Sequence, residues 1–105
     1  MDERSRQIYL ADIYGGLLTE KQQNILNSYL NEDMSVSEIA RDENISRQAA
    51  FDLLKRSEKL LEDYDEKLGL FERYLRNREL IERIREICGD DPETDGLFEE
   101  LLNNI

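Results

Sequence analysis

Residues 36–53 read VSEIARDENISRQAAFDL, and this stretch decides the fold. Just before it, Ser35 forms a capping box with Glu38, in which the hydroxyl and the carboxylate satisfy free backbone N–H groups at a helix start. Asn44 is one of the few residue types besides glycine that tolerate a left-handed backbone. Ser46 is a preferred N-cap for the next helix. The stretch therefore predicts two helices joined by a tight turn, a helix-turn-helix.

The composition of the turn region indicates how the two helices pack. Helices that cross over a tight turn need a small residue where they touch, and Ala40 supplies it. We expect four further side chains to be buried between them: Ile39, Ile45, Ala50 and Leu53. Glu43 departs from the pattern, because such motifs usually place an apolar residue just before the turn.

Helical periodicity and capping residues continue on both sides of this motif. Gly15-Gly16 is a stop signal, Thr19 an N-cap, and Asp91-Pro92 the start of a last helix after the linker at 89–92. The predicted helices are 3–16, 20–31, 36–43, 47–76, 77–88 and 92–104. The fold class is all-α, a small helical bundle that contains a helix-turn-helix and a long central helix. We expect one helical domain over 1–105, with a helix-turn-helix core at 19–60 and a C-terminal helical extension at 61–105.

The long central helix is predicted from a heptad pattern that crosses Gly69 without losing phase. Its apolar seam consists of Ala50, Leu54, Ser57, Leu61, Tyr64, Leu68, Phe71 and Leu75. Because the seam is long for one small domain, it predicts a homodimer built on the C-terminal half. The alternative is a monomer whose chain folds back on itself.

Composition excludes most enzymes. The chain has no histidine, no glycine-rich phosphate loop and no nucleophile beside a base, so we expect no catalysis, no metal and no cofactor. Cys88, the lone cysteine, cannot form an intramolecular disulfide and is expected to be a small buried residue at a helix end. Neither a secretory signal nor a membrane span is predicted, which indicates a cytoplasmic protein.

The distribution of charge along the chain indicates where a binding surface lies. The net charge is −11, which is unfavourable for contact with phosphate backbones. Only residues 46–61 and 71–86 are net positive. The first of these segments is the second helix of the motif, where a recognition helix presents side chains to the major groove.

The candidate nucleic-acid-binding residues lie on this helix: Ser46, Arg47, Gln48, Phe51, Asp52, Lys55, Arg56 and Lys59. Arg47 can fork onto guanine and Gln48 onto adenine. Lys55, Arg56 and Lys59 would contact phosphates. The alternative is an ordinary solvated helix face, with Phe51 packed on the first helix of the motif or on a partner.

Several ordered blocks of sequence resemble the YlxM family of bacterial helix-turn-helix proteins. The blocks are LLTEKQ at 17–22, SEIA at 37–40, ISRQA at 45–49, KRSE at 55–58 and LEDYDEKL at 61–68. The resemblance runs from about Tyr9 to Leu75, and the family's motif is similar to region four of bacterial sigma factors. It implies a small non-enzymatic protein linked to the signal recognition particle pathway, with no catalytic residues to carry over.

Two functions follow as expectations. The first is a regulatory protein that binds nucleic acid, DNA or RNA, through residues 46–59. The second is an accessory factor that contacts the signal recognition particle GTPase or its RNA and does not bind DNA.

Overall fold

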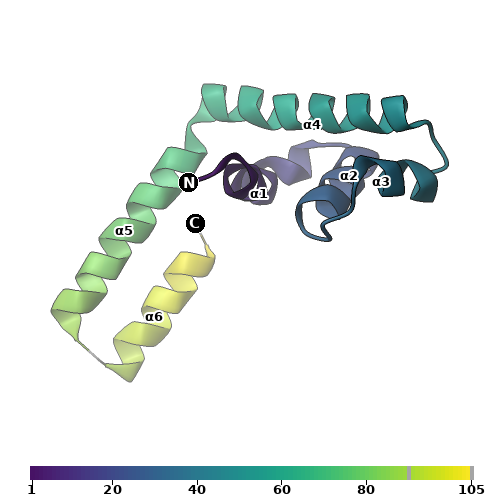
Figure 1. Ribbon diagram of the computed structural model, residues 1–105. Coiled ribbons are helices and arrows are strands. Elements are labelled where there is room, and N and C mark those ends of the chain that lie inside the picture. Colours follow the sequence, from purple (N-terminus) through teal and green to yellow (C-terminus); the bar gives the residue numbers. More distant parts are fainter. Residues whose placement is uncertain (90, 105) are drawn as a thin grey trace. The chain divides into compact units, whose positions relative to one another are not determined.

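The computed structural model describes residues 1–89 and 91–104, which contain six α-helices, one 3₁₀ helix and no β-strand (Figure 1). The elements are α1 (Glu3–Tyr14), η1 (Gly15–Leu17), α2 (Glu20–Leu30), α3 (Val36–Asp42), α4 (Arg47–Leu68), α5 (Leu70–Cys88) and α6 (Pro92–Asn103). The all-α fold class with its helix-turn-helix and long central helix is confirmed.

Helix starts coincide with the predicted caps. The Thr19 hydroxyl accepts from the backbone N–H of Gln22, whose side chain in turn accepts from Thr19, so α2 begins with a complete capping box. The Ser35 and Glu38 pair forms the second one at α3. Each side-chain oxygen satisfies a backbone N–H group that the first helical turn leaves without a partner. Local sequence chemistry therefore determines where these helices begin.

The chain divides into two compact units, Met1–Gly69 and Leu70–Ile105. In the first unit, α4 packs against α1, α2 and α3, which lie along one side of it (Figure 1). Its buried apolar side chains come from all four helices and the loop before α2: Leu10, Tyr14, Leu18, Ile25, Leu26, Leu30, Ile39, Ala40, Ala50, Leu54 and Leu61. Each helix thus contributes one face to a shared core.

The predicted helix over 47–76 is wrong in its extent, because α4 ends at Leu68 and α5 begins at Leu70. Gly69 between them has a left-handed backbone (φ 63°, ψ 28°), and its N–H donates to the Asp65 carbonyl oxygen at 2.7 Å. Glycine adopts this conformation without steric cost and commonly ends helices in this way. The heptad pattern runs across Gly69, but the helix does not.

The apolar seam is therefore divided. Its α4 members Ala50, Leu54 and Leu61 are buried inside the first unit, and the Ser57 hydroxyl donates to the Leu53 carbonyl oxygen. Leu68, in contrast, is half exposed. From Ala50 to Leu61 the seam is core of its own chain, so this part offers no surface for the predicted homodimer.

The first helix is also shorter than predicted. α1 ends at Tyr14, and Gly15–Leu17 form a 3₁₀ turn. A 3₁₀ turn has about three residues rather than 3.6, which shifts the following side chains around the axis. Leu17 in this turn is exposed, and Leu18 directly after it is buried.

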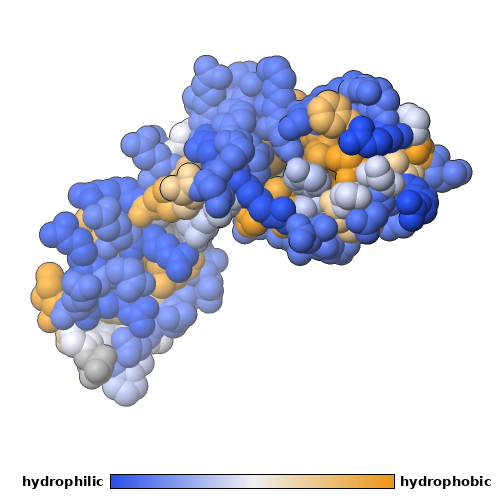
Figure 2. All heavy atoms as spheres, viewed as in Figure 1, coloured by the Kyte–Doolittle hydropathy of each residue, from blue (hydrophilic) through white to orange (hydrophobic). Residues whose placement is uncertain are grey.

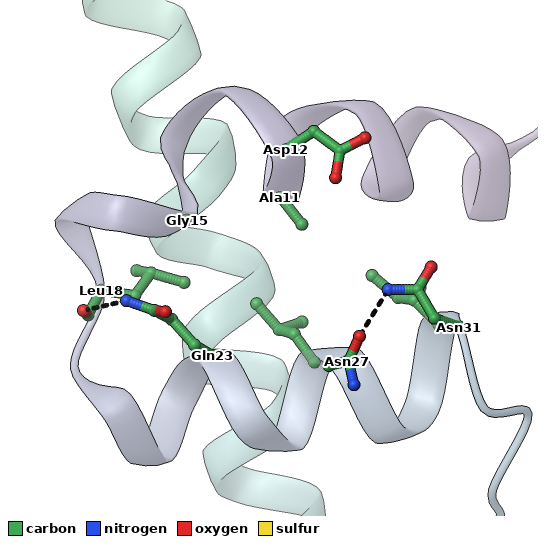
Figure 3. Close-up of a pocket in the computed structure, with 9 residues that line it drawn as sticks. Ala11, Asp12, Gly15, Leu18, Gln23, Asn27 and Asn31 are labelled. Atoms are coloured by element: carbon green, nitrogen blue, oxygen red, sulfur yellow. Dashed lines mark hydrogen bonds between the residues drawn. The ribbon is translucent and has the colours of Figure 1, made fainter.

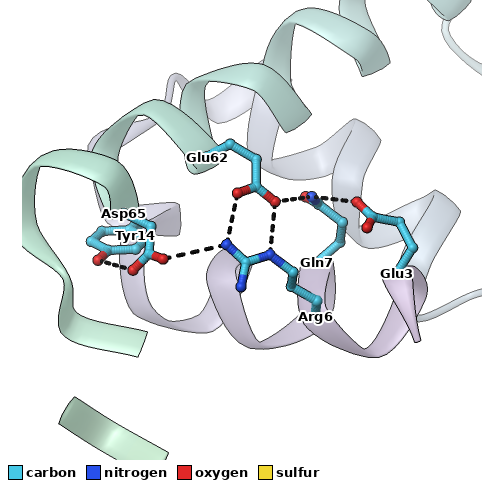
Figure 4. Close-up of polar contacts among 6 residues, drawn as sticks. All are labelled: Glu3, Arg6, Gln7, Tyr14, Glu62 and Asp65. Atoms are coloured by element: carbon cyan, nitrogen blue, oxygen red, sulfur yellow. Dashed lines mark hydrogen bonds and ion pairs between the residues drawn. The ribbon is translucent and has the colours of Figure 1, made fainter. Parts of the chain in front are cut away.

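A polar cluster joins α1 to α4 (Figure 4). The Arg6 guanidinium donates to both carboxylate oxygens of Glu62 at 2.8 and 3.0 Å and contacts Asp65 at 3.4 Å. Gln7 donates to Glu62 at 3.0 Å, and the Tyr14 hydroxyl donates to Asp65 at 2.7 Å. The hydrogen bonds with Glu62 raise the pKa of Arg6 above its ordinary value, so the guanidinium stays charged.

The second unit is a hairpin of α5 and α6, in which Phe71 and Ile81 are the buried apolar side chains among the described residues. Cys88 was predicted to be buried, and this is wrong: it is exposed. It lies at the last residue of α5, and two helices cannot cover every face of each other. No helix of the described part of the chain is long and apolar enough to cross a membrane.

Candidate nucleic-acid interface

The turn between α3 and α4 has the geometry that the sequence indicates. Asn44 adopts the left-handed conformation (φ 55°). After it, the Ile45 N–H donates back to the Ala40 carbonyl oxygen at 3.0 Å, which closes the end of α3. The Ser46 hydroxyl then accepts from the Ala49 N–H at 3.0 Å and starts α4. This short connection fixes the direction in which α4 leaves α3.

Packing of the two helices agrees largely with the prediction. Ile39, Ala40 and Ala50 are buried, while Ile45 and Leu53 are only half buried. Glu43, the departure from the usual apolar residue, is exposed at the C-cap of α3. A charged side chain is tolerated there because it points into solvent.

The structure places all eight predicted site residues on one exposed surface, from the N-cap Ser46 to Lys59 of α4. The opposite face of the same helix packs into the core through Ala50 and Leu54. A helix that is anchored on one face presents the other rigidly, as a recognition helix must. We call this surface the α4 face: Ser46, Arg47, Gln48, Phe51, Asp52, Lys55, Arg56 and Lys59.

Side chains on the α4 face are partly held by neighbours. Arg47 Nε donates to Ser37 Oγ at 3.2 Å, which ties it across the turn to α3. Gln48 Nε2 donates to Asp52 Oδ1 at 2.8 Å, and Lys59 pairs with Asp63 at 3.1 Å. Exposed contacts of this kind contribute at most about 1 kcal/mol, so a phosphate or a base edge can replace them at low cost.

Arg56 differs from the other cations of this face. It is exposed and has no hydrogen bond or ion pair with any residue in 1–89 or 91–104. Its guanidinium therefore needs no release from a protein partner before it meets an anion.

Phe51 is the aromatic member of the face, with 39% of its surface exposed. Lys55 Nζ lies 5.6 Å from the centre of its ring and also pairs with Glu58 at 3.5 Å. A cation at this distance over a ring face is attracted to it. The Phe51 ring is not part of the core. Together with the ammonium group of Lys55 it forms one contact surface.

The start of α4 is favourable for anions. Its first turn contains no acidic residue, whereas α1, α2, α3, α5 and α6 each have one or two there. Free N–H groups and the helix dipole make such a terminus attractive to phosphate. Ser37 belongs to this surface through its bond to Arg47 and was not predicted, because no spacing rule links it to position 47.

Other hollows in the first unit are less suited to a ligand. A pocket of about 140 Å³ lies between α1 and α2, with an apolar floor that includes Leu18 and amide side chains along α2, among them Gln23 and Asn27 (Figure 3). None of the predicted site residues lines it. Within 1–89 and 91–104, no three histidine, cysteine, aspartate or glutamate side chains are grouped so that they could hold a metal ion.

Comparison with known proteins decides the family. The sequence model of the family described as "Putative helix-turn-helix protein, YlxM / p13 like" matches residues 1–101. The chain belongs to this family, UPF0122. Its sequence is 42% identical to the UPF0122 protein of Geobacillus kaustophilus over 105 residues, which covers 96% of each chain.

Two further UPF0122 proteins extend the comparison. The Bacillus pumilus protein is 40% identical over 95 residues, which covers 90% of this chain and 86% of the relative. The Clostridium kluyveri protein is 53% identical over 72 residues, which covers 69% of this chain and 65% of the relative. UPF0122 is a family of helix-turn-helix proteins and not a family of enzymes, in agreement with the motif built by α3 and α4.

Proposed function

We propose that this UPF0122 protein is a regulatory protein that binds nucleic acid through the α4 face. In this proposal Arg47 and Gln48 contact base edges, and Lys55, Arg56 and Lys59 contact phosphates. The similarity of the family's motif to region four of sigma factors favours duplex DNA as the ligand. A homodimer would suit this role, because two copies on adjacent half-sites multiply a weak affinity.

The observation that carries the proposal is the position of the basic segment. Residues 46–61 hold four basic and two acidic residues in a chain of net charge −11. All four basic side chains lie on the exposed face of α4, and the opposite face of this helix packs into the core. Electrostatic interactions of exposed charges are screened beyond about 8 Å at physiological salt, so acidic residues farther away than this weaken the attraction of phosphates only slightly.

The test is a fluorescence anisotropy titration with labelled mixed-sequence 30-base-pair DNA and a labelled mixed-sequence RNA hairpin. The variant replaces Arg47, Gln48, Lys55 and Arg56 by alanine. We expect its affinity to fall at least tenfold and the salt dependence to flatten by about one counterion for each lost phosphate contact. Circular dichroism checks that the variant is folded.

A matched control distinguishes the loss of the α4 face from a general loss of positive charge. Lys21, Lys67 and Arg73 are exposed cations that do not belong to the α4 face, and replacing them by alanine also removes three positive charges. We expect this control to bind nearly as the unchanged protein does. Equal binding by the folded α4 variant, or equal loss in the control, would contradict the assignment.

A second function is favoured by the exposed Phe51 and the acidic surroundings of the α4 face. An aromatic ring beside a cation suits a protein surface or unpaired RNA bases as well as a duplex. In this alternative the protein is an accessory factor that contacts the signal recognition particle GTPase or its RNA without binding DNA. Both functions place it in the cytoplasm.

The two functions are distinguished by what the protein retains from a cell extract. A tagged protein is used for a pulldown, and bound proteins and nucleic acids are both identified. Enrichment of DNA fragments supports the first function. Enrichment of targeting GTPase or its RNA, with no DNA, supports the second.

A further inference from the structure

The α5–α6 hairpin carries an apolar surface on the outside of the second unit, and Figure 2 shows apolar atoms at the surface there among charged ones. Besides Leu70 at the start of α5, five large apolar side chains of the hairpin are exposed by these fractions: Leu80 39%, Ile84 48%, Ile87 85%, Leu97 60% and Leu101 46%. Scattered exposed apolar residues are normal, but a contiguous group marks an interaction site.

These side chains share one face. At about 100° per residue, Leu80, Ile84 and Ile87 fall within about 60° of each other on α5, and Leu97 and Leu101 within about 40° on α6. The two stripes border one groove, because a hollow of about 260 Å³ between the helices is lined by Asn77, Leu80, Ile81 and Leu101. We call this surface the hairpin face.

Charges beside the hairpin face are complementary to each other. α5 has five arginines and four glutamates, whereas α6 has four acidic residues and no basic one. Arg83 lies at the outer edge of the α5 stripe and Glu100 at the outer edge of the α6 stripe. Neither side chain has a hydrogen bond or ion pair with another residue in the described part of the chain, whereas Arg85 pairs with Asp95 and Glu99 inside the hairpin.

We propose that two copies of the chain form a homodimer by packing their hairpin faces together as an antiparallel four-helix bundle. The occupant of the groove is the same surface of a second copy, which makes the interface isologous. Four-helix bundles in solution bury the apolar stripes of their helices in a common core. This dimer uses α5 and α6, and not the seam on α4.

Charge selects one of the two ways in which the faces can meet. If the two-fold axis runs across the helices, α5 lies on α5 and the acidic α6 lies on the equally acidic α6 of the partner subunit. If it runs along them, α5 lies on α6 of the partner subunit, and the outer edges with opposite charge meet. Arg85 contacts Glu99, and Leu101 lies near Leu80, so Glu100 is at about the same level along the hairpin as Arg83. The second arrangement therefore pairs Arg83 with Glu100 of the partner subunit.

The size of the hairpin face indicates how tightly the two copies should bind each other. α5 has 19 residues and α6 has 12, so they are about 28 and 18 Å long. A face two helices wide and this long is at the small end of stable interfaces, which bury about 800 Å² on each partner. We therefore expect a dissociation constant in the micromolar range.

Sedimentation equilibrium of the full chain tests the proposal. At high micromolar concentration we expect a mass twice the 12.4 kDa of one chain. Ile84→Asp and Leu101→Asp should each return it to one chain, while Leu17→Asp, a matched change at an exposed leucine of the first unit, should not. A protein that stays at 12.4 kDa at all concentrations, or a dimer that the hairpin variants leave intact, would overturn the proposal.

A charge exchange tests the arrangement. Arg83→Glu and Glu100→Arg should each raise the dissociation constant about tenfold, and the double variant should restore it. Lys21→Glu makes the same charge change outside the hairpin and should have no such effect. Circular dichroism confirms that each variant is folded. Two single variants that weaken the dimer without restoration in the double variant would exclude the pairing of α5 with α6.

Discussion

At the scale of single residues, the contact of Arg6 with Glu62 joins positions 56 apart in the sequence. Two hydrogen bonds, a second carboxylate at Asp65 and partial shielding from water make it stronger than an isolated surface pair. It holds α1 on α4 and so supports the helix that carries the α4 face. No local pattern indicates this contact, because neither residue caps a helix or belongs to an apolar stripe.

Arg6→Ala should lower the free energy of unfolding by about 1–2 kcal/mol, because Glu62 and Asp65 lose their shared cationic partner. Lys59→Ala is the control: it removes an exposed pair with Asp63 on the same helix and should cost less than about 0.5 kcal/mol. Urea unfolding followed by circular dichroism measures both. An equal loss of stability in the two variants would show that the Arg6 contact contributes no more than the exposed pair of Lys59 with Asp63.

Asn44 offers a second test at this scale, because its left-handed backbone favours few residue types. Asn44→Ala should destabilise the protein by about 1 kcal/mol, and Asn44→Gly should be nearly neutral. Thermal unfolding measures the difference. A glycine variant that is as unstable as the alanine variant would mean that the Asn44 side chain, and not its backbone conformation, supports the turn.

At the scale of elements, the helix starts at N-cap residues could be predicted, whereas the ends of α1 and α4 and the start of α5 could not. Starts at Thr19, Ser35 and Ser46 follow from side chains within three residues of the N–H groups that they satisfy. The end at Gly69 competes with a heptad pattern that favours continuation. Glycine is tolerated inside helices, so the pattern alone does not decide between a bend and an end.

Gly69→Ala tests this end. Any side chain at φ 63° is strained, and we expect a loss of about 1 kcal/mol in stability. Gly15→Ala is the matched control, because Gly15 has a right-handed helical backbone and an added Cβ would meet no atom within 4 Å. The control should be neutral or stabilising. A Gly69→Ala variant as stable as the control would show that α4 can continue through this position.

At the scale of the whole molecule, the two units differ in the core that each contains. Eleven of the buried apolar residues belong to Met1–Gly69, and Phe71 and Ile81 belong to Leu70–Ile105. We expect a fragment 1–69 to fold by itself and a fragment 70–105 at low concentration to be mostly unfolded, because chains below about 40 residues rarely hold a sufficient core. Circular dichroism with thermal unfolding distinguishes them. A fragment 70–105 that melts cooperatively as a monomer would contradict this expectation.

The candidate site was predictable to the extent that it depends on one helix. Residues on a single helix share a face by periodicity alone, so the exposure of Arg47, Lys55 and Arg56 follows from the buried positions between them. Ser37 was missed because its contact with Arg47 depends on the angle between α3 and α4. The exposure of Cys88 was missed because it depends on how far α6 covers α5.

The most direct test of the central claim is a two-dimensional ¹H–¹⁵N NMR titration of the full chain with the mixed-sequence 30-base-pair DNA. We predict that the largest shifts of backbone amide signals map to residues 46–59 and to Ser37, and that they weaken as salt is added. The same titration with the RNA hairpin shows which nucleic acid is preferred. Shifts confined to other helices, or no shifts with either nucleic acid at low salt, would contradict the assignment of the α4 face.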